Sequence, residues 1–162
     1  MNTWTATPPD RHPEASSTSA ISDMIITDYW GTQVARGQGR RALSSYQAGE
    51  NNPVSFTYGE LDAVVTRMGA GLAALGVEKG SVVSCQLPNG WQMTALFLAC
   101  ARIGAVFNPL MPIFRERELR FMLGHARSHL LVVPKHFRGF DYASMAEGLR
   151  TDLPELRHVL VI

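Results

Sequence analysis

Residues 81–109 read SVVSCQLPNGWQMTALFLACARIGAVFNP, and this stretch decides the fold. It opens with Ser81 to Leu87, where the apolar Val82, Val83, Cys85 and Leu87 are typical of a buried strand, and Pro88-Asn89-Gly90 ends that strand in a turn. Trp91 to Ile103 is apolar on nearly every side, which predicts a buried helix. Ala105 to Asn108 predicts another short strand. Strand, helix and strand in this order favour two parallel strands joined by a crossover helix.

An amphipathic helix precedes this unit. Thr57 and Glu60 have the spacing of a capping box, so the helix is predicted to begin at Tyr58. Its apolar positions recur at steps of four and three and predict one buried stripe, made of Leu61, Val65, Met68, Leu72 and Leu75. Gly76 is predicted to end this helix, as Gly104 ends the next, because glycine adopts the left-handed conformation at little cost.

The same alternation extends over the rest of the chain. Periodicity predicts further helices at Met24 to Val34, Glu116 to Gly124 and Tyr142 to Leu149, and strands at Ala42 to Tyr46, His129 to Val133 and His158 to Ile162. The fold class is therefore α/β, a mostly parallel sheet flanked by helices. We expect a disordered, proline-rich tail over 1–20 and a domain over 21–162.

The last predicted strand runs to the final residue, Ile162, with no turn or polar segment after it. Complete domains seldom end in this way, so we expect 21–162 to be an incomplete N-terminal portion of a larger domain. A terminal strand docked in its sheet is the alternative. An incomplete sheet exposes apolar surface, so we also expect marginal stability and aggregation.

Composition narrows the function classes. Fifteen basic and fourteen acidic side chains give a net charge of +1, which provides no field that would attract nucleic acid. Cys85 and Cys100 lie in apolar stretches without metal-ligand spacing, so we expect neither a disulfide nor a metal site. There is no secretory signal pattern and no apolar run long enough to span a membrane, so a cytoplasmic location is expected.

Two patterns resemble functional motifs but fit structural roles better. Gly69 to Ala74 matches the dinucleotide fingerprint, yet it falls inside a predicted helix and does not follow a strand, so these small residues are interpreted as a face for close packing. His125 and His129 have a four-residue spacing, but Gly124 and the following strand place them at a helix-to-strand junction with no third ligand nearby. Ser16 to Ser19 lacks the glycines and lysine of a phosphate-binding loop and is assigned to the tail.

Two basic clusters are the remaining candidates. Arg115, Arg117 and Arg120 alternate with Glu116 and Glu118, which predicts a solvated helix face of mixed charge. Lys135, His136 and Arg138 follow a predicted strand, where parallel sheets place ligand-binding loops, so they are a candidate phosphate contact, with a solvated loop as the alternative.

The order of short motifs along the chain carries a family resemblance. Phe56 to Leu61 resembles the first core motif of the adenylate-forming superfamily, and further matches follow in the family's order: Leu75-Gly76-Val77, Lys79-Gly80, Val82-Val83, Leu87-Pro88-Asn89 and Ala101 to Pro109. The resemblance covers about 28–162 and points to AMP-forming acyl-CoA synthetases. Residues 137–142 and 153–159 look most like the branch with medium-chain and cyclohexanecarboxylate-CoA ligases. One departure is Arg115 to Leu119, where the family's usual helix cap is missing.

The resemblance implies that the family member catalyses a two-step ligation of a carboxylic acid. The acid attacks the α-phosphate of ATP with Mg²⁺ present, and CoA then displaces AMP. The family's phosphate loop and catalytic lysine have no match in these 162 residues, so we expect the chain to be inactive alone and to contain no catalytic residue. Lys135 and Arg138 would contact CoA phosphates. A non-catalytic CoA-binding or partner-binding module, and one half of a split ligase, are the alternatives.

Overall fold

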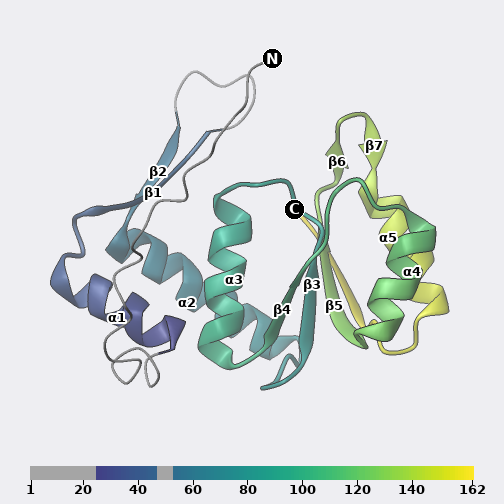
Figure 1. Ribbon diagram of the computed structural model, residues 1–162, viewed down its shortest axis with the longest axis horizontal. Coiled ribbons are helices and arrows are strands. Elements are labelled where there is room, and N and C mark those ends of the chain that lie inside the picture. Colours follow the sequence, from purple (N-terminus) through teal and green to yellow (C-terminus); the bar gives the residue numbers. More distant parts are fainter. Residues whose placement is uncertain (1–24, 47–52) are drawn as a thin grey trace, which may run out of the picture.

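The computed structural model describes residues 25–46 and 53–162 (Figure 1). Its centre is a sheet of four parallel strands in the order β4-β3-β5-β8. The strands are β3 (Val82–Cys85), β4 (Val106–Pro109), β5 (Ser128–Val133) and β8 (His158–Val161). The predicted α/β class with a parallel sheet is confirmed. The predicted tail and its Ser/Thr cluster lie outside the described residues.

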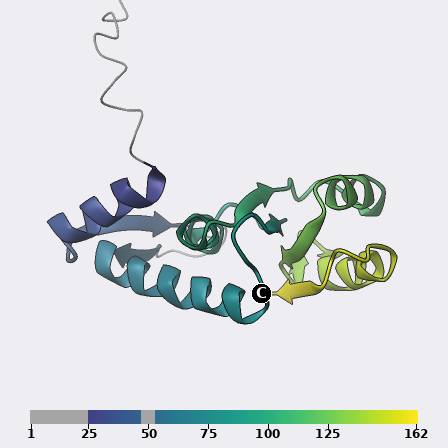
Figure 2. The same cartoon turned by 90° about the horizontal axis from the view of Figure 1, so that it is seen from below.

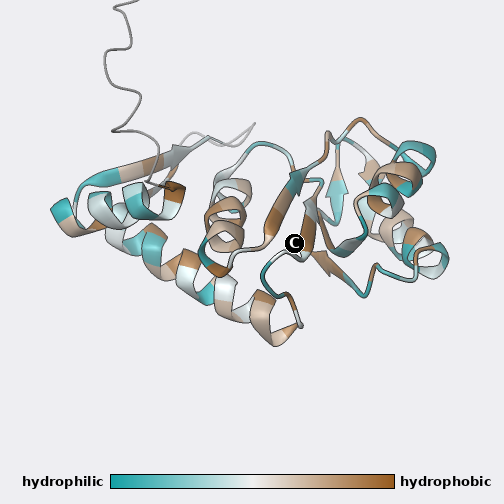
Figure 3. Ribbon diagram, turned by 60° about the horizontal axis from the view of Figure 1, so that its bottom comes forward, coloured by the Kyte–Doolittle hydropathy of each residue, from teal (hydrophilic) through white to brown (hydrophobic). Residues whose placement is uncertain are grey.

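Helices cover both faces of this sheet (Figures 1 and 2). Helices α2 (Tyr58–Ala74) and α3 (Trp91–Ile103) pack on one face, and α4 (Glu116–His125) and α5 (Tyr142–Asp152) pack on the other. Because strand side chains alternate between faces, Val83 and Leu130 point into the α2–α3 core, whereas Leu131 and Val133 point into the α4–α5 core. Figure 3 shows the hydrophobic residues gathered in the central strands.

The start of α2 is as predicted. The backbone N–H of Glu60 donates to Thr57 Oγ1, and the backbone N–H of Thr57 donates to a Glu60 carboxylate oxygen at 2.8 Å, which completes the capping box. Gly69, from the fingerprint-like stretch, is buried against α3, since an added Cβ there would lie 3.3 Å from Ile103 Cγ2. The interpretation as a packing face is confirmed for Gly69 and Leu72, which are buried, and is wrong for Ala70, Gly71, Ala73 and Ala74, which are exposed.

The N-terminal part adds a helix and a separate antiparallel pair of strands. These are α1 (Ile26–Arg36), β1 (Arg41–Ser45) and β2 (Val54–Thr57). Sequence reasoning placed α1 and β1 within two residues of their positions but missed β2, because Phe56 and Thr57 were assigned only to the helix start. Trp30 of α1 donates from its indole N–H to Asp62 of α2 at 2.7 Å, which ties this part to the main body.

Helix α4 begins at Glu116 even though its N-cap, Arg115, provides no side-chain cap. The carboxylate of Glu118 accepts from the backbone N–H of Arg115 at 3.2 Å, so half of the usual capping arrangement remains. A short antiparallel hairpin, β6 (His136–Phe137) and β7 (Phe140–Asp141), lies between β5 and α5 and was not predicted, since its strands have only two residues each. None of the described helices is long and apolar enough to span a membrane.

Candidate functional site

The candidate site lies at the carboxyl edge of the parallel sheet. The chain leaves β3 through α3 on one face to reach β4, and leaves β4 through α4 on the opposite face to reach β5 on the other side of β3. The β3–β5 boundary is therefore a switch point, where open α/β sheets bind ligands beyond the strand ends. Three segments meet there: 86–90 after β3, 110–115 after β4 and 134–141 after β5.

Gln86 connects the first two segments. Its side chain is fully buried, and its amide nitrogen donates to the backbone carbonyls of Met111 at 3.0 Å and Phe114 at 2.9 Å. Both neighbours are acceptors, so the nitrogen must face them, and the buried amide oxygen Oε1 has no partner among the described residues. Held in this way, the 110–115 loop presents Met111 and Ile113 to solvent, 58% and 74% exposed.

Arg115 and Tyr142 connect the 110–115 loop to the β6–β7 hairpin. The Arg115 guanidinium donates to the carbonyls of Pro112 at 2.6 Å and Phe114 at 2.9 Å, and it lies 4.1 Å from the centre of the Phe140 ring. The Tyr142 hydroxyl donates to the same Pro112 carbonyl at 2.8 Å. The prediction that Arg115 belongs to a solvated helix face is therefore wrong, because its planar cation stacks on an aromatic ring.

The hairpin turns at Arg138 and Gly139, whose φ angles are 49° and 76°. Positive φ at both central residues is the pattern of a type I′ turn, which matches the twist of short antiparallel strands. The side chains of Lys135, His136 and Arg138 are exposed, and the Arg138 guanidinium lies 5.3 Å from the Phe137 ring centre. Solvent-exposed cations therefore gather at the carboxyl edge, as the sequence predicted for this segment.

Asp141 is the acidic residue closest to these cations in the hairpin. One of its carboxylate oxygens lies 3.7 Å from His136 Nε2. As the N-cap of α5 it also accepts from the backbone N–H and the hydroxyl of Ser144, and these hydrogen bonds, the backbone one first, hold its pKa below the usual value. Asp141 is thus engaged mainly in capping and leaves Lys135 and Arg138 available to an anion.

The other candidate residues lie elsewhere. Arg117 and Arg120 are on the exposed face of α4, where Arg120 pairs with Asp152, so the mixed-charge prediction is confirmed for these two. His125 stacks on Phe121, whereas His129 lies in β5 with its ring 5.7 Å from that of His158, so the two histidines do not face a common point.

Neither the cysteines nor the carboxylates suggest a reactive centre. Burial raises the pKa of Cys85 to about 11 and that of Cys100 to about 12, which keeps both thiols protonated. Across 25–46 and 53–162, no group of three or more His, Cys, Asp or Glu side chains is arranged to hold a metal ion.

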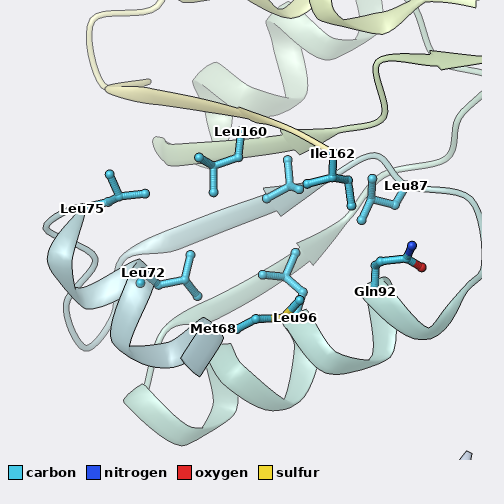
Figure 4. A pocket seen from close by; sticks show the side chains of 10 residues that line it. Met68, Leu72, Leu75, Leu87, Gln92, Leu96, Leu160 and Ile162 are labelled. Carbon is cyan, nitrogen blue, oxygen red and sulfur yellow. The ribbon is translucent and has the colours of Figure 1, made fainter. Parts of the chain in front are cut away.

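A hollow lies between the sheet and helices α2 and α3. It has a volume of about 230 Å³, and Figure 4 shows Leu160 and Ile162 of the β8 segment facing Met68 and Leu72 of α2 across it. Its lining is almost wholly apolar, with Gln92 as the polar exception. Strand β8 is an edge of the sheet, and Val161 and Ile162 are partly exposed there. The hollow contains no group suited to acid, base or phosphate chemistry.

Comparison with known proteins identifies the family. Residues 30–162 match the model of the AMP-binding enzyme family. The chain is 37% identical over 111 residues to 2-hydroxy-7-methoxy-5-methyl-1-naphthoate–CoA ligase of Streptomyces carzinostaticus, covering 68% of this chain and 20% of that protein. It is 30% identical over 138 residues to medium-chain fatty-acid–CoA ligase of Escherichia coli (strain K12), covering 85% of this chain and 24% of that protein.

A solved structure agrees with these matches. Fatty acyl CoA synthetase of Mycobacterium tuberculosis superposes with a TM-score of 0.68 at 25% identity, over 83% of this chain and 26% of that one. The chain thus spans about a fifth to a quarter of the length of the relatives it matches. Since the family model covers most of the chain and the described fold agrees with it, the chain belongs to the family of AMP-binding enzymes.

Proposed function

We propose that this chain is part of an acid–CoA ligase that acts on a medium-chain or alicyclic carboxylic acid. A carboxylate oxygen of the acid attacks the α-phosphorus of ATP, and pyrophosphate leaves with the electron pair of the broken P–O bond. The CoA thiolate then attacks the acyl carbonyl carbon, and AMP leaves. The observation that carries the proposal is the family match over residues 30–162, together with relatives that are CoA ligases.

The described residues support a scaffold role in this reaction. They build the carboxyl edge of a parallel sheet, but they offer neither a carboxylate cluster for Mg²⁺ nor a nucleophile with a paired base. Adenylation needs cationic and metal groups that stabilise charge developing on the phosphates. We therefore propose that the 162-residue chain alone does not catalyse adenylation.

Acid-dependent exchange of pyrophosphate into ATP tests this proposal. The 162-residue chain is assayed beside the product of the whole reading frame that contains it, with octanoate, cyclohexanecarboxylate, salicylate and acetate as acids. We expect exchange by the whole product, strongest with octanoate or cyclohexanecarboxylate, and none by the chain alone. Exchange by the chain alone would disprove its inactivity. Exchange favouring salicylate or acetate would overturn the substrate class, and no exchange with any acid would overturn the ligase function.

We further propose that Lys135 and Arg138 contact phosphate groups of CoA. Both side chains are exposed on one short segment at the carboxyl edge, and Asp141 beside them is occupied by Ser144. Each charge-assisted contact to a phosphate stabilises a complex by about 1.5 to 3 kcal/mol, which is roughly a tenfold to hundredfold change in affinity.

Titration calorimetry with CoA and with 3′-dephospho-CoA tests this contact. Lys135→Ala and Arg138→Ala are each expected to weaken CoA binding by about tenfold or more. Arg117→Ala, which removes a cation from the exposed face of α4, is the matched control and should leave the affinity unchanged. Equal affinities for all four proteins would remove these residues from the site. If the chain is a non-catalytic CoA-binding module, we expect the same calorimetric result without any exchange activity. If it is one half of a split ligase, we expect activity only after a second chain is added.

A further inference from the structure

We infer that Arg115 is a positioning residue that locks the β6–β7 hairpin onto the loop between β4 and α4. The inference rests on the proposed function, because it concerns how Lys135 and Arg138 are held for their phosphate ligand. Arg115 itself is only half exposed, and its guanidinium is directed at protein groups.

The guanidinium joins two segments that are distant in sequence. On one side it donates to the carbonyls of Pro112 and Phe114 in its own loop. On the other side it lies 4.1 Å from the centre of the Phe140 ring in β7 and 5.5 Å from that of Tyr142. A planar cation satisfies both sets of partners at once, because its N–H groups point outward in the plane while its faces contact the rings.

The hairpin depends on such contacts. Its ladder consists of two residue pairs, His136 with Asp141 and Phe137 with Phe140, and a two-stranded hairpin is at best marginally stable alone in water. Its turn requires positive φ at Arg138, a non-glycine residue, which adds a conformational cost. Contacts from outside the hairpin must therefore help to keep it in place. Phe137 and Phe140 pack against the α4–α5 core, and Arg115 adds a contact from a loop that Gln86 already fixes.

Lysine cannot replace arginine in this role. A lysine ammonium keeps the charge and can donate to one or both carbonyls, but it is a compact, strongly hydrated ion without a flat face to lie on Phe140. Arg115→Lys thus separates the charge from the stacking contact. Arg117→Lys is the matched control, because Arg117 lies two residues away on the exposed face of α4.

Amide hydrogen exchange gives a readout that does not require any ligand. The backbone N–H of Tyr142 donates to the carbonyl of Lys135 at 3.1 Å and closes the base of the hairpin. In Arg115→Lys we expect this N–H and the ladder amides of Phe137 and Phe140 to exchange roughly tenfold faster than in the original chain, equivalent to about 1.4 kcal/mol. Amides in the middle of α2 should keep their rates, which shows that the fold is intact, and Arg117→Lys should change neither region.

A double-mutant cycle distinguishes positioning from a general loss of stability. Phe140→Leu alone should also speed hairpin exchange, and combining it with Arg115→Lys should add little, because both changes remove the same contact. Additive effects, or a hairpin that exchanges no faster in Arg115→Lys, would overturn the inference. If α2 amides also speed up in Arg115→Lys, the Phe140→Leu variant and its hairpin rates decide the outcome.

Calorimetry with CoA then links the lock to the binding site. Arg115→Lys is expected to weaken CoA binding by about the factor by which it opens the hairpin, whereas Lys135→Ala weakens binding and leaves the exchange of the Tyr142 amide unchanged. If the original chain does not bind CoA, the phosphate-contact proposal fails while the exchange data still support or refute the lock. If the hairpin opens and CoA binds as before, the lock does not serve this site.

Discussion

Replacing Gln86 with leucine should destabilise the protein and loosen the 110–115 loop. The change removes two hydrogen bonds, at a cost of about 1 to 1.5 kcal/mol each, while the Met111 carbonyl keeps the Phe114 N–H and the Phe114 carbonyl keeps the Arg115 guanidinium as donors. It also removes the buried, unpartnered Oε1, which returns about 1 kcal/mol. The net loss is about 1 to 2 kcal/mol, or a fall in melting temperature of roughly 2 to 8 °C for a domain of this size.

Urea unfolding followed by tryptophan fluorescence measures this change. Trp30 and Trp91 both pack against the α2–α3 core and report its unfolding. Gln92→Leu is the matched control, since it makes the same chemical change on the wall of the apolar hollow and should shift stability by less than about 0.5 kcal/mol or raise it. If Gln86→Leu proved as stable as the original chain or more so, the cost of the buried oxygen would outweigh both donor bonds, and the bracing role of Gln86 would be wrong.

Three further predictions concern the reactivity of the cysteines, the stability of the protein at acid pH and the substitution of two glycines. Burial raises the pKa of Cys85 to about 11 and that of Cys100 to about 12, so neither thiol should react with a disulfide reagent at pH 8 until urea unfolds the chain. Reaction of the folded protein at the rate of a free thiol would contradict their burial. The pKa of Asp141 is lowered in the folded state, so its contribution to stability is full above the unfolded value near 3.8 and disappears as the pH falls through the folded value. Asp141→Asn should accordingly lower stability at neutral pH, and its difference from the original chain should disappear as the pH falls well below 3.8, as seen by thermal melts across this range. Gly104→Ala should lower the free energy of unfolding by about 1 to 2 kcal/mol, because φ is +74° and the new Cβ would lie 3.0 Å from Lys79. Gly148→Ala, on an open helix surface, should raise it by about 0.5 to 1 kcal/mol. Equal melting temperatures of the two variants would refute the backbone argument.

The main elements could be predicted because their signals are local. The apolar stripe of α2, its capping box and the left-handed Gly76 all lie within twenty residues, and the structure places each as expected. Helix α3 has the predicted bounds, Trp91–Ile103, for the same reason. Each of these features depends on backbone geometry that neighbouring residues impose, so the pattern and the structure agree.

The features that the sequence did not predict depend on contacts with distant parts of the chain. Strand β2 and the β6–β7 hairpin are too short to show a period, and their order comes from partners elsewhere in the chain. Arg115 alternates with acidic residues as a solvated face does, and only the hairpin, more than twenty residues later, provides the ring on which it stacks. The one local signal for Gln86 was a large amide side chain directly after a mostly apolar strand, since a buried polar side chain there needs partners.

The site therefore depends on contacts between side chains and backbone carbonyls of one loop. Donors from the segment after β3, from the start of α4 and from the start of α5 converge on the carbonyls of residues 111, 112 and 114. No regular secondary structure satisfies these carbonyls, so each donor decides the path of the loop, and the loop in turn orders the cationic hairpin. The exposed side chains of Lys135 and Arg138 can be substituted without disturbing the sheet. Substituting Gln86, Arg115 or Tyr142, in contrast, moves both the 110–115 loop and the β6–β7 hairpin. Mutations in the three donors should therefore affect loop order and ligand affinity together, whereas Lys135→Ala should affect affinity alone.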